Sequence, residues 1–96
     1  MSHKVYGRSW TAVSRRYREQ QPLCESCRAE GRVRLGEERH HIVPIRIAPE
    51  RRLDVDNLLN LCRPCHERLE AMYESDIDGY QTLVASIKHP RGGNFV

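Results

Sequence analysis

Residues 61–66, Leu61-Cys62-Arg63-Pro64-Cys65-His66, bring three structural signals together in one short stretch. The leucine-rich residues 58–61 predict a short strand or turn that leads into it. Two residues separate Cys62 from Cys65, which is the spacing of a knuckle that binds a metal ion. Pro64 suits the first turn of a helix, which we expect to run to about residue 75. The stretch therefore predicts an extended segment, a metal knuckle and a helix in direct succession.

A second cysteine pair, Cys24 and Cys27, has the same spacing as Cys62 and Cys65. This spacing lets both thiolates of a pair point at one tetrahedral ion at about 2.3 Å. Four thiolates close the coordination shell, so we predict one structural zinc held by all four cysteines. A chain of 96 residues often needs such a metal, because it buries only a modest part of its surface.

Three other arrangements are open to the cysteines. Two disulfides are disfavoured, because no apolar run after Met1 resembles a signal peptide. A redox dithiol needs only one pair, and a site made of His66 and three cysteines leaves one thiol idle. No apolar run is long enough to cross a membrane, and we expect a cytoplasmic protein, in the host cytoplasm if a phage encodes it.

The other stretch that suggests chemistry is Glu38-Arg39-His40-His41-Ile42-Val43-Pro44. We expect a strand over residues 38–42, because Pro44 ends strand pairing. A strand points adjacent side chains to opposite faces, so His40 and His41 can do different jobs near one centre. A metal ligand and a general base are such jobs. The alternative is a structural histidine beside an exposed one.

The remaining residues predict a small α+β domain. Trp10, Val13 and Tyr17 recur at helical spacing, so we expect a helix over residues 9–20, with Trp10 and Tyr17 in the core. Residues 43–56 form a polar connection that is long for so small a domain. A final helix is expected over 80–87. We expect a flexible leader at 1–7, one domain at 8–88 and a flexible tail at 89–96.

The chain resembles the HNH endonucleases, and three blocks carry the resemblance. They are Glu38-Arg39-His40-His41-Ile42-Val43-Pro44, Asn57-Leu58-Leu59-Asn60-Leu61 and Cys62-Arg63-Pro64-Cys65-His66. Their order and spacing, and the cysteine pairs that frame them, look like those of zinc-stapled family members in phages and bacteria. The resemblance covers about residues 8–75. It implies a ββα-metal finger, a β-hairpin followed by a helix, here preceded by an N-terminal helix.

The resemblance also implies roles for four side chains. His40 and His66 stand where the family binds one catalytic divalent ion, for which Mg²⁺, Mn²⁺, Ni²⁺ and Zn²⁺ are candidates. His41 stands at the position of the general base, and Asn57 at that of the asparagine that holds loop and base in register. The implied reaction is hydrolysis of DNA phosphodiester bonds, cutting or nicking the DNA.

The chain departs from the family pattern in the helix after His66. Many members carry lysine three residues beyond this histidine, where this chain has Leu69. The adjacent Arg68 is a candidate substitute. Glu70 lies on the same helix face as His66 and is a candidate third metal ligand. For Glu70, the sequence favours a solvated side chain over a metal ligand.

The uneven charge fits two readings equally, a polyanionic partner and a soluble helix with a charged outer face. Residues 1–34 hold eight lysines and arginines against three acids, although the whole chain carries only +3. We expect double-stranded DNA, contacted through phosphates with weak sequence preference, and a phage terminase as a further partner by resemblance. The candidate DNA contacts are Arg15, Arg16, Arg18, Arg46, Arg51 and Arg52. The alternatives are a zinc-knuckle module that binds nucleic acid without cutting it, and a structural zinc domain that recruits a protein.

Overall fold

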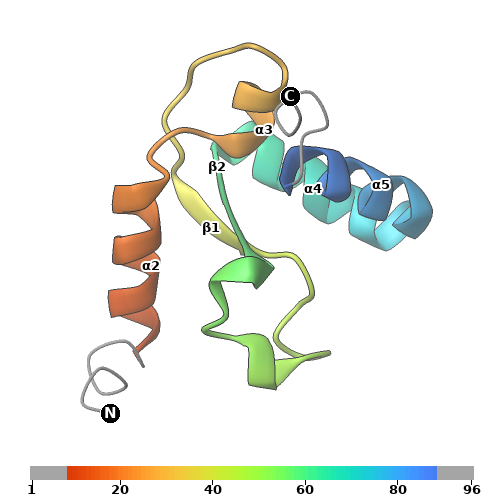
Figure 1. Ribbon diagram of the computed structural model, residues 1–96. Coiled ribbons are helices and arrows are strands. Elements are labelled where there is room, and N and C mark those ends of the chain that lie inside the picture. Colours follow the sequence, from red (N-terminus) through yellow and green to blue (C-terminus); the bar gives the residue numbers. More distant parts are fainter. Residues whose placement is uncertain (1–8, 89–96) are drawn as a thin grey trace, which may run out of the picture.

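The computed structural model describes residues 9–88, and its elements surround a two-stranded antiparallel hairpin (Figure 1). The expected leader at 1–7 and tail at 89–96 lie outside the described residues. In chain order the elements are α2 (Trp10–Gln20), α3 (Glu25–Ala29), β1 (Glu38–His41), the 3-10 helices η1 (Pro49–Arg51) and η2 (Val55–Asn57), β2 (Leu58–Leu61), α4 (Arg63–Ser75) and α5 (Ile77–Lys88). The hairpin followed by α4 confirms the predicted α+β fold.

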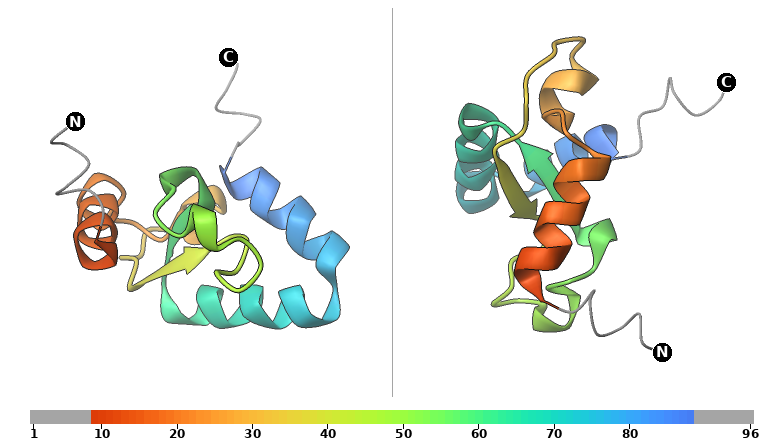
Figure 2. Two further views of the ribbon diagram at one scale, coloured as in Figure 1. Left: turned by 90° about the horizontal axis from the view of Figure 1, so that it is seen from below. Right: turned by 90° about the vertical axis from the view of Figure 1, so that its left-hand side faces the viewer.

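Strands β1 and β2 pair with Glu38 opposite Leu61. The hairpin lies between α2 on one side and the antiparallel pair α4 and α5 on the other (Figures 1 and 2). Because side chains alternate along a strand, Glu38 and His40 face α4, whereas Arg39 and His41 face α2. The two adjacent histidines are thereby sent to opposite sides of the hairpin.

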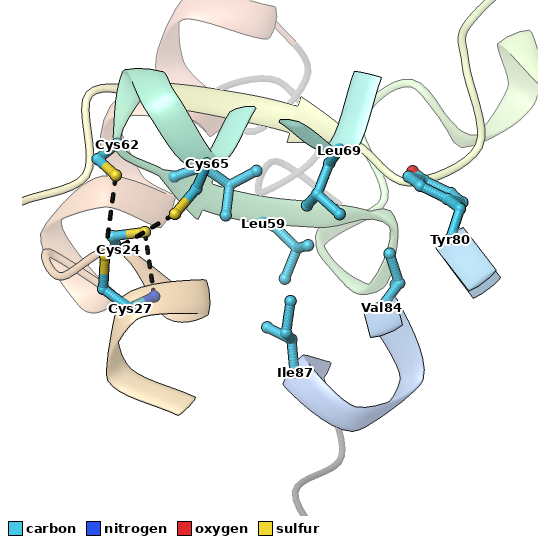
Figure 3. Close-up of a cluster of buried hydrophobic side chains, with 10 residues drawn as sticks. Cys24, Cys27, Leu59, Cys62, Cys65, Leu69, Tyr80, Val84 and Ile87 are labelled. Atoms are coloured by element: carbon cyan, nitrogen blue, oxygen red, sulfur yellow. Dashed lines mark hydrogen bonds between the residues drawn. The ribbon is translucent and has the colours of Figure 1, made fainter. Parts of the chain in front are cut away.

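Strand β2 is buried on both faces, and its residues belong to two different hydrophobic clusters. Leu59 and Leu61 pack with the four cysteines and with apolar residues of α4 and α5 (Figure 3). Leu58 packs against Val13 and Tyr17 of α2. None of the helices within residues 9–88 combines the length and the apolar character needed to span a bilayer.

The start of α2 agrees with the sequence prediction. The Ser9 hydroxyl caps the helix by accepting a hydrogen bond from the backbone N–H of Ala12 at 3.1 Å. Val13 and Tyr17 are buried on the hairpin, and Trp10 is half-buried beside them. The apolar face of α2 is therefore a core face, as its spacing predicts.

Two segments differ from the expectation. Helix α5 begins at Ile77, so the predicted start at residue 80 was wrong. The Asp76 carboxylate accepts a hydrogen bond from the N–H of Gly79 at 3.0 Å, which turns an expected loop into the first turn of a helix. Residues 25–29, for which the sequence predicts no helix, form the short helix α3. The Cys24 sulfur caps this helix at the N–H of Cys27, at 3.4 Å.

Candidate functional site

The four cysteine thiols meet where α3 approaches the start of α4 (Figure 3). All four residues are buried, and their sulfurs lie within 4.8 Å of one another. The Sγ atoms of Cys62 and Cys65 each lie 3.8 Å from that of Cys27. Four sulfurs around a tetrahedral zinc at about 2.3 Å would be about 3.8 Å apart, whereas a disulfide requires about 2.05 Å. The cysteines are therefore positioned to hold a zinc ion, as the sequence predicts.

A second group of possible metal ligands lies where β1 faces α4. His40, His66 and Glu70 offer ligand atoms that all lie within 4.8 Å of one another. Nε2 of His66 is 3.2 Å from a carboxylate oxygen of Glu70, one helical turn away. Two imidazoles and one carboxylate suit a divalent first-row ion. This group is able to bind such an ion, and it includes Glu70, for which the sequence favoured a solvated side chain.

Burial keeps the imidazole of His40 neutral. The residue is 7% exposed, and burial lowers the pKa of His40 to about 4, helped by the proximity of His66 and His41. Near pH 7 the ring therefore carries no charge, which is the form that binds a metal ion. Its Nε2 atom lies 2.7 Å from the hydroxyl oxygen of Tyr80 on α5.

His66 has a carboxylate at its other ring nitrogen. Nδ1 of His66 lies 2.9 Å from Oε1 of Glu38, which β1 points toward α4. A carboxylate that accepts the Nδ1 proton leaves the Nε2 lone pair facing Glu70. This arrangement is typical of metal-binding histidines, because the carboxylate fixes the tautomer and the orientation of the ring.

His41 lies on the α2 side of the hairpin and is held by two contacts. Its Nε2 atom is 2.9 Å from the backbone carbonyl oxygen of Arg52, and its ring centroid is 4.7 Å from that of Trp10. A carbonyl oxygen can only accept, so Nε2 carries the ring proton and Nδ1 of the neutral ring keeps its lone pair. That lone pair gives His41 the means to act as a general base.

The Asn57 side chain forms hydrogen bonds within the loop whose backbone contacts His41. It is 1% exposed, its Oδ1 accepts from the N–H of Val43 at 2.9 Å, and its Nδ2 donates to the Val43 carbonyl at 3.1 Å. Nδ2 also lies 3.5 Å from the carbonyl oxygen of Arg51. The amide thereby ties the end of β1 to the segment whose next carbonyl contacts His41. Its polar contacts are to the loop backbone.

One cleft of about 820 Å³ connects these groups. It lies between β1, the loop that follows β1, and α4. The charged and titratable side chains along it are Arg39, His40, His41, Arg46, His66, Glu70, Tyr73, Glu74 and Tyr80. The possible general base and the possible metal ligands therefore open onto the same space, which is large enough for a segment of a polymeric substrate.

The six arginines predicted to contact DNA are distributed over three places. Arg15, Arg16 and Arg18 are exposed on α2. Arg46 is exposed at the cleft. Arg51 pairs with Asp54, with Nε and Oδ2 3.2 Å apart, while Arg52 is exposed beside it. The structure places Arg46 at the candidate active site. The three arginines of α2 form a separate group on the exposed surface of that helix.

Arg68, considered as a substitute for the family lysine, points to the knuckle formed by Cys24 and Cys27. Its guanidinium donates to the Ser26 hydroxyl at 3.2 Å and lies 3.7 Å from the Glu30 carboxylate. The sequence argument placed Trp10 in the core and gave no role to Tyr80, but these residues contact His41 and His40 from helices on either side. Strand alternation could have placed Glu38 beside His40, but no local pattern indicates the contacts of Tyr80 or Trp10.

The comparisons with known proteins agree with this geometry. The HNH endonuclease family profile matches residues 24–71, half of the chain. The crystal structure of the HNH endonuclease of deep-sea thermophilic bacteriophage GVE2 with manganese ion is similar, with a TM-score of 0.66 and 29% sequence identity. That match covers 76% of this chain and 82% of the phage protein. Among curated proteins, none matched.

Proposed function

Because the chain belongs to the HNH endonuclease family, we propose that it is a metal-dependent nuclease that hydrolyses phosphodiester bonds of double-stranded DNA. One observation carries the proposal. His41, with an available Nδ1 lone pair, opens onto the same cleft as the group His40, His66 and Glu70. A general base beside a site for a divalent ion is the arrangement that phosphodiester hydrolysis requires.

In the proposed reaction, Nδ1 of His41 takes a proton from a water molecule as the water oxygen attacks phosphorus. The bond from phosphorus to one DNA oxygen breaks, and this leaving oxygen takes a proton from a solvent water, which leaves a phosphate monoester on one end and a hydroxyl on the other. The Arg52 carbonyl and the Trp10 ring hold the imidazole in place during the transfer. A divalent ion bound by His40, His66 and Glu70 would supply positive charge for the leaving oxygen.

We further propose that this ion is separate from the structural zinc and less tightly bound. Two imidazoles and an exposed carboxylate leave positions open for water and phosphate, whereas four thiolates close their shell. The related phage protein was crystallised with manganese, and this donor set suits Mn²⁺, Ni²⁺ or Zn²⁺, with Mg²⁺ serviceable when phosphate contributes ligands. Weak sequence preference, a role in phage DNA packaging beside a terminase, and a cytoplasmic location stay predictions from the resemblance.

The test of the function is cleavage of supercoiled plasmid by the purified protein with Mn²⁺, Ni²⁺ or Mg²⁺. We expect nicked or linear product with at least one ion. A weak chelator should stop cleavage while the circular dichroism spectrum is retained, and added Mn²⁺ should restore it. Binding without cleavage under every ion would favour the non-catalytic nucleic-acid-binding module. Loss of activity and fold together at every chelator concentration would contradict two separate metal sites.

For DNA contact we propose the six exposed or loop arginines together with Arg39. The Arg39 guanidinium donates to the Ser14 hydroxyl and to the Asn60 side-chain oxygen, both at 2.9 Å. Within residues 9–88 it forms no ion pair with an acid, although burial and the nearby Arg18 lower its pKa. A half-buried arginine beside the cleft whose partners are all neutral suits a DNA phosphate, which would supply the missing negative charge.

Salt dependence tests the arginine surface. The logarithm of the affinity for duplex DNA should fall linearly with the logarithm of salt concentration, by about 0.9 per phosphate neutralised. Replacing Arg15 and Arg16 by glutamine should weaken binding to all sequences alike and reduce this slope. The matched lysine variant keeps both charges and should bind like the parent. Fluorescence anisotropy with the His41→Ala protein measures binding without cleavage, and a salt-independent affinity would argue against this surface.

A further inference from the structure

Tyr80 places one hydroxyl between two groups of the site. The residue is 2% exposed and lies on α5, at the end of the buried cluster beyond Leu69 (Figure 3). Its hydroxyl oxygen is 2.7 Å from Nε2 of His40 and 2.7 Å from the backbone carbonyl oxygen of Ile42. Both distances are those of short hydrogen bonds, so each requires a donor and an acceptor.

The single hydroxyl proton determines which ring nitrogen of His40 is protonated. The Ile42 carbonyl has no proton to give, so the Tyr80 hydroxyl donates to it. The hydroxyl then has only lone pairs to offer to His40, and Nε2 must be the donor. Since a neutral imidazole carries one ring proton, Nδ1 of His40 keeps its lone pair.

We propose that Tyr80 is a positioning residue for the divalent ion, because it holds His40 in the tautomer whose Nδ1 binds the metal. The proposal rests on the proposed function only in assigning that ion to His40, His66 and Glu70. Glu38 acts similarly on His66: it accepts from Nδ1, so that Nε2, which lies 3.2 Å from the Glu70 carboxylate, is the nitrogen directed at the group of ligands. The two histidines therefore present different nitrogens, each set by a partner at the opposite side of its ring.

The packing of α5 makes this hydroxyl a fixed partner. Val84 and Ile87 of the same helix are buried in the cluster that contains Leu59 and Leu69. The Tyr80 ring also packs edge-on against Tyr73 of α4, with centroids 5.1 Å apart. Helix α5 lies beyond the residues that match the family profile, so the metal site would draw a supporting residue from outside the family motif.

The test compares Tyr80→Phe with Tyr73→Phe, which removes a hydroxyl from the neighbouring ring in the same cleft. Nuclear magnetic resonance of ¹⁵N-labelled histidine rings, in zinc-loaded protein without a second ion, reports the tautomer of His40. The signal is assigned by its loss in His40→Gln. We expect the Nε2–H tautomer in the parent and in Tyr73→Phe, and a mixture of both tautomers in Tyr80→Phe.

Calorimetric titration with Mn²⁺, without DNA, gives the second readout. We expect Tyr80→Phe to bind Mn²⁺ about 10–100-fold more weakly than the parent, and Tyr73→Phe to bind it equally well. A parent protein in the Nδ1–H tautomer would overturn the proposal, and so would Mn²⁺ binding by Tyr80→Phe that is as tight as in the parent. The tautomer of His40 is measured in the parent protein itself, so this readout tests the proposal even if Tyr80→Phe fails to fold. Failure of plasmid cleavage would refute the nuclease function and leave both readouts unchanged.

Discussion

Replacing Cys62 by serine is expected to unfold the domain. The residue is fully buried between the end of β2 and the start of α4, and its sulfur is one of four positioned around a single point. A structural zinc held by thiolates contributes roughly 10–16 kcal/mol of apparent binding free energy. The whole stability of a small domain is only about 5–15 kcal/mol. Loss of one ligand therefore removes an amount comparable to the entire free energy of unfolding.

Circular dichroism during heating and an assay of bound zinc measure this effect. The parent should hold one tightly bound zinc per chain and unfold cooperatively, and Cys62→Ser should show neither property. Ser26→Ala is the control, because it is a small change at a buried residue of the other knuckle, between Cys24 and Cys27, that supplies no ligand. A folded Cys62→Ser protein without zinc would show that the cysteines are not needed for folding.

Replacing His41 by alanine should abolish cleavage while binding of DNA and of the divalent ion persists. The ring faces α2, away from the group of His40 and His66, so its removal should leave the metal ligands in place. Removal of a general base typically costs about 10²–10⁴-fold in rate. Replacing His40 by alanine should instead weaken binding of the ion, and high Mn²⁺ concentrations should partly restore cleavage.

Calorimetric titration with Mn²⁺ and plasmid nicking, run on both variants, separate the two roles. His41→Ala should bind Mn²⁺ like the parent and nick at a strongly reduced rate. His40→Ala should show weak binding, and its nicking rate should rise with the Mn²⁺ concentration. If His41→Ala loses the ion and His40→Ala retains it, the roles assigned to the two histidines must be exchanged.

Local spacing was sufficient to predict several parts of the molecule. Ser9 caps α2, and α4 runs from residue 63 to 75, close to the expected bounds. Strand alternation separates His40 from His41 without any knowledge of what packs on either face. These features depend on residues a few positions apart, because capping, strand alternation and helical periodicity all involve residues that are close in the sequence.

The start of α5 shows where local signals mislead. Asp78 and Gly79 are turn-forming residues, and the sequence therefore places a loop before residue 80. In the structure the carboxylate of Asp76, just before the helix, satisfies the N–H of Gly79, and Asp78 and Gly79 both lie inside the helix. Burial of Tyr80, Val84 and Ile87 against α4 and the hairpin stabilises this helix beyond the preference of its first turn.

The sequence by itself determined the two cysteine knuckles, the order of the hairpin and helix, and the residue types in the candidate active site. Each depends on spacings of a few residues around residues 24–27, 38–44 and 57–66. Only the tertiary structure decided which nitrogen each histidine presents and that His40 joins His66 and Glu70 in one group. The reason is physical: a tautomer is set by the partner on the far side of the ring, and Tyr80 lies 40 residues from His40 along the chain. Packing of α5 on the hairpin brings these two residues together.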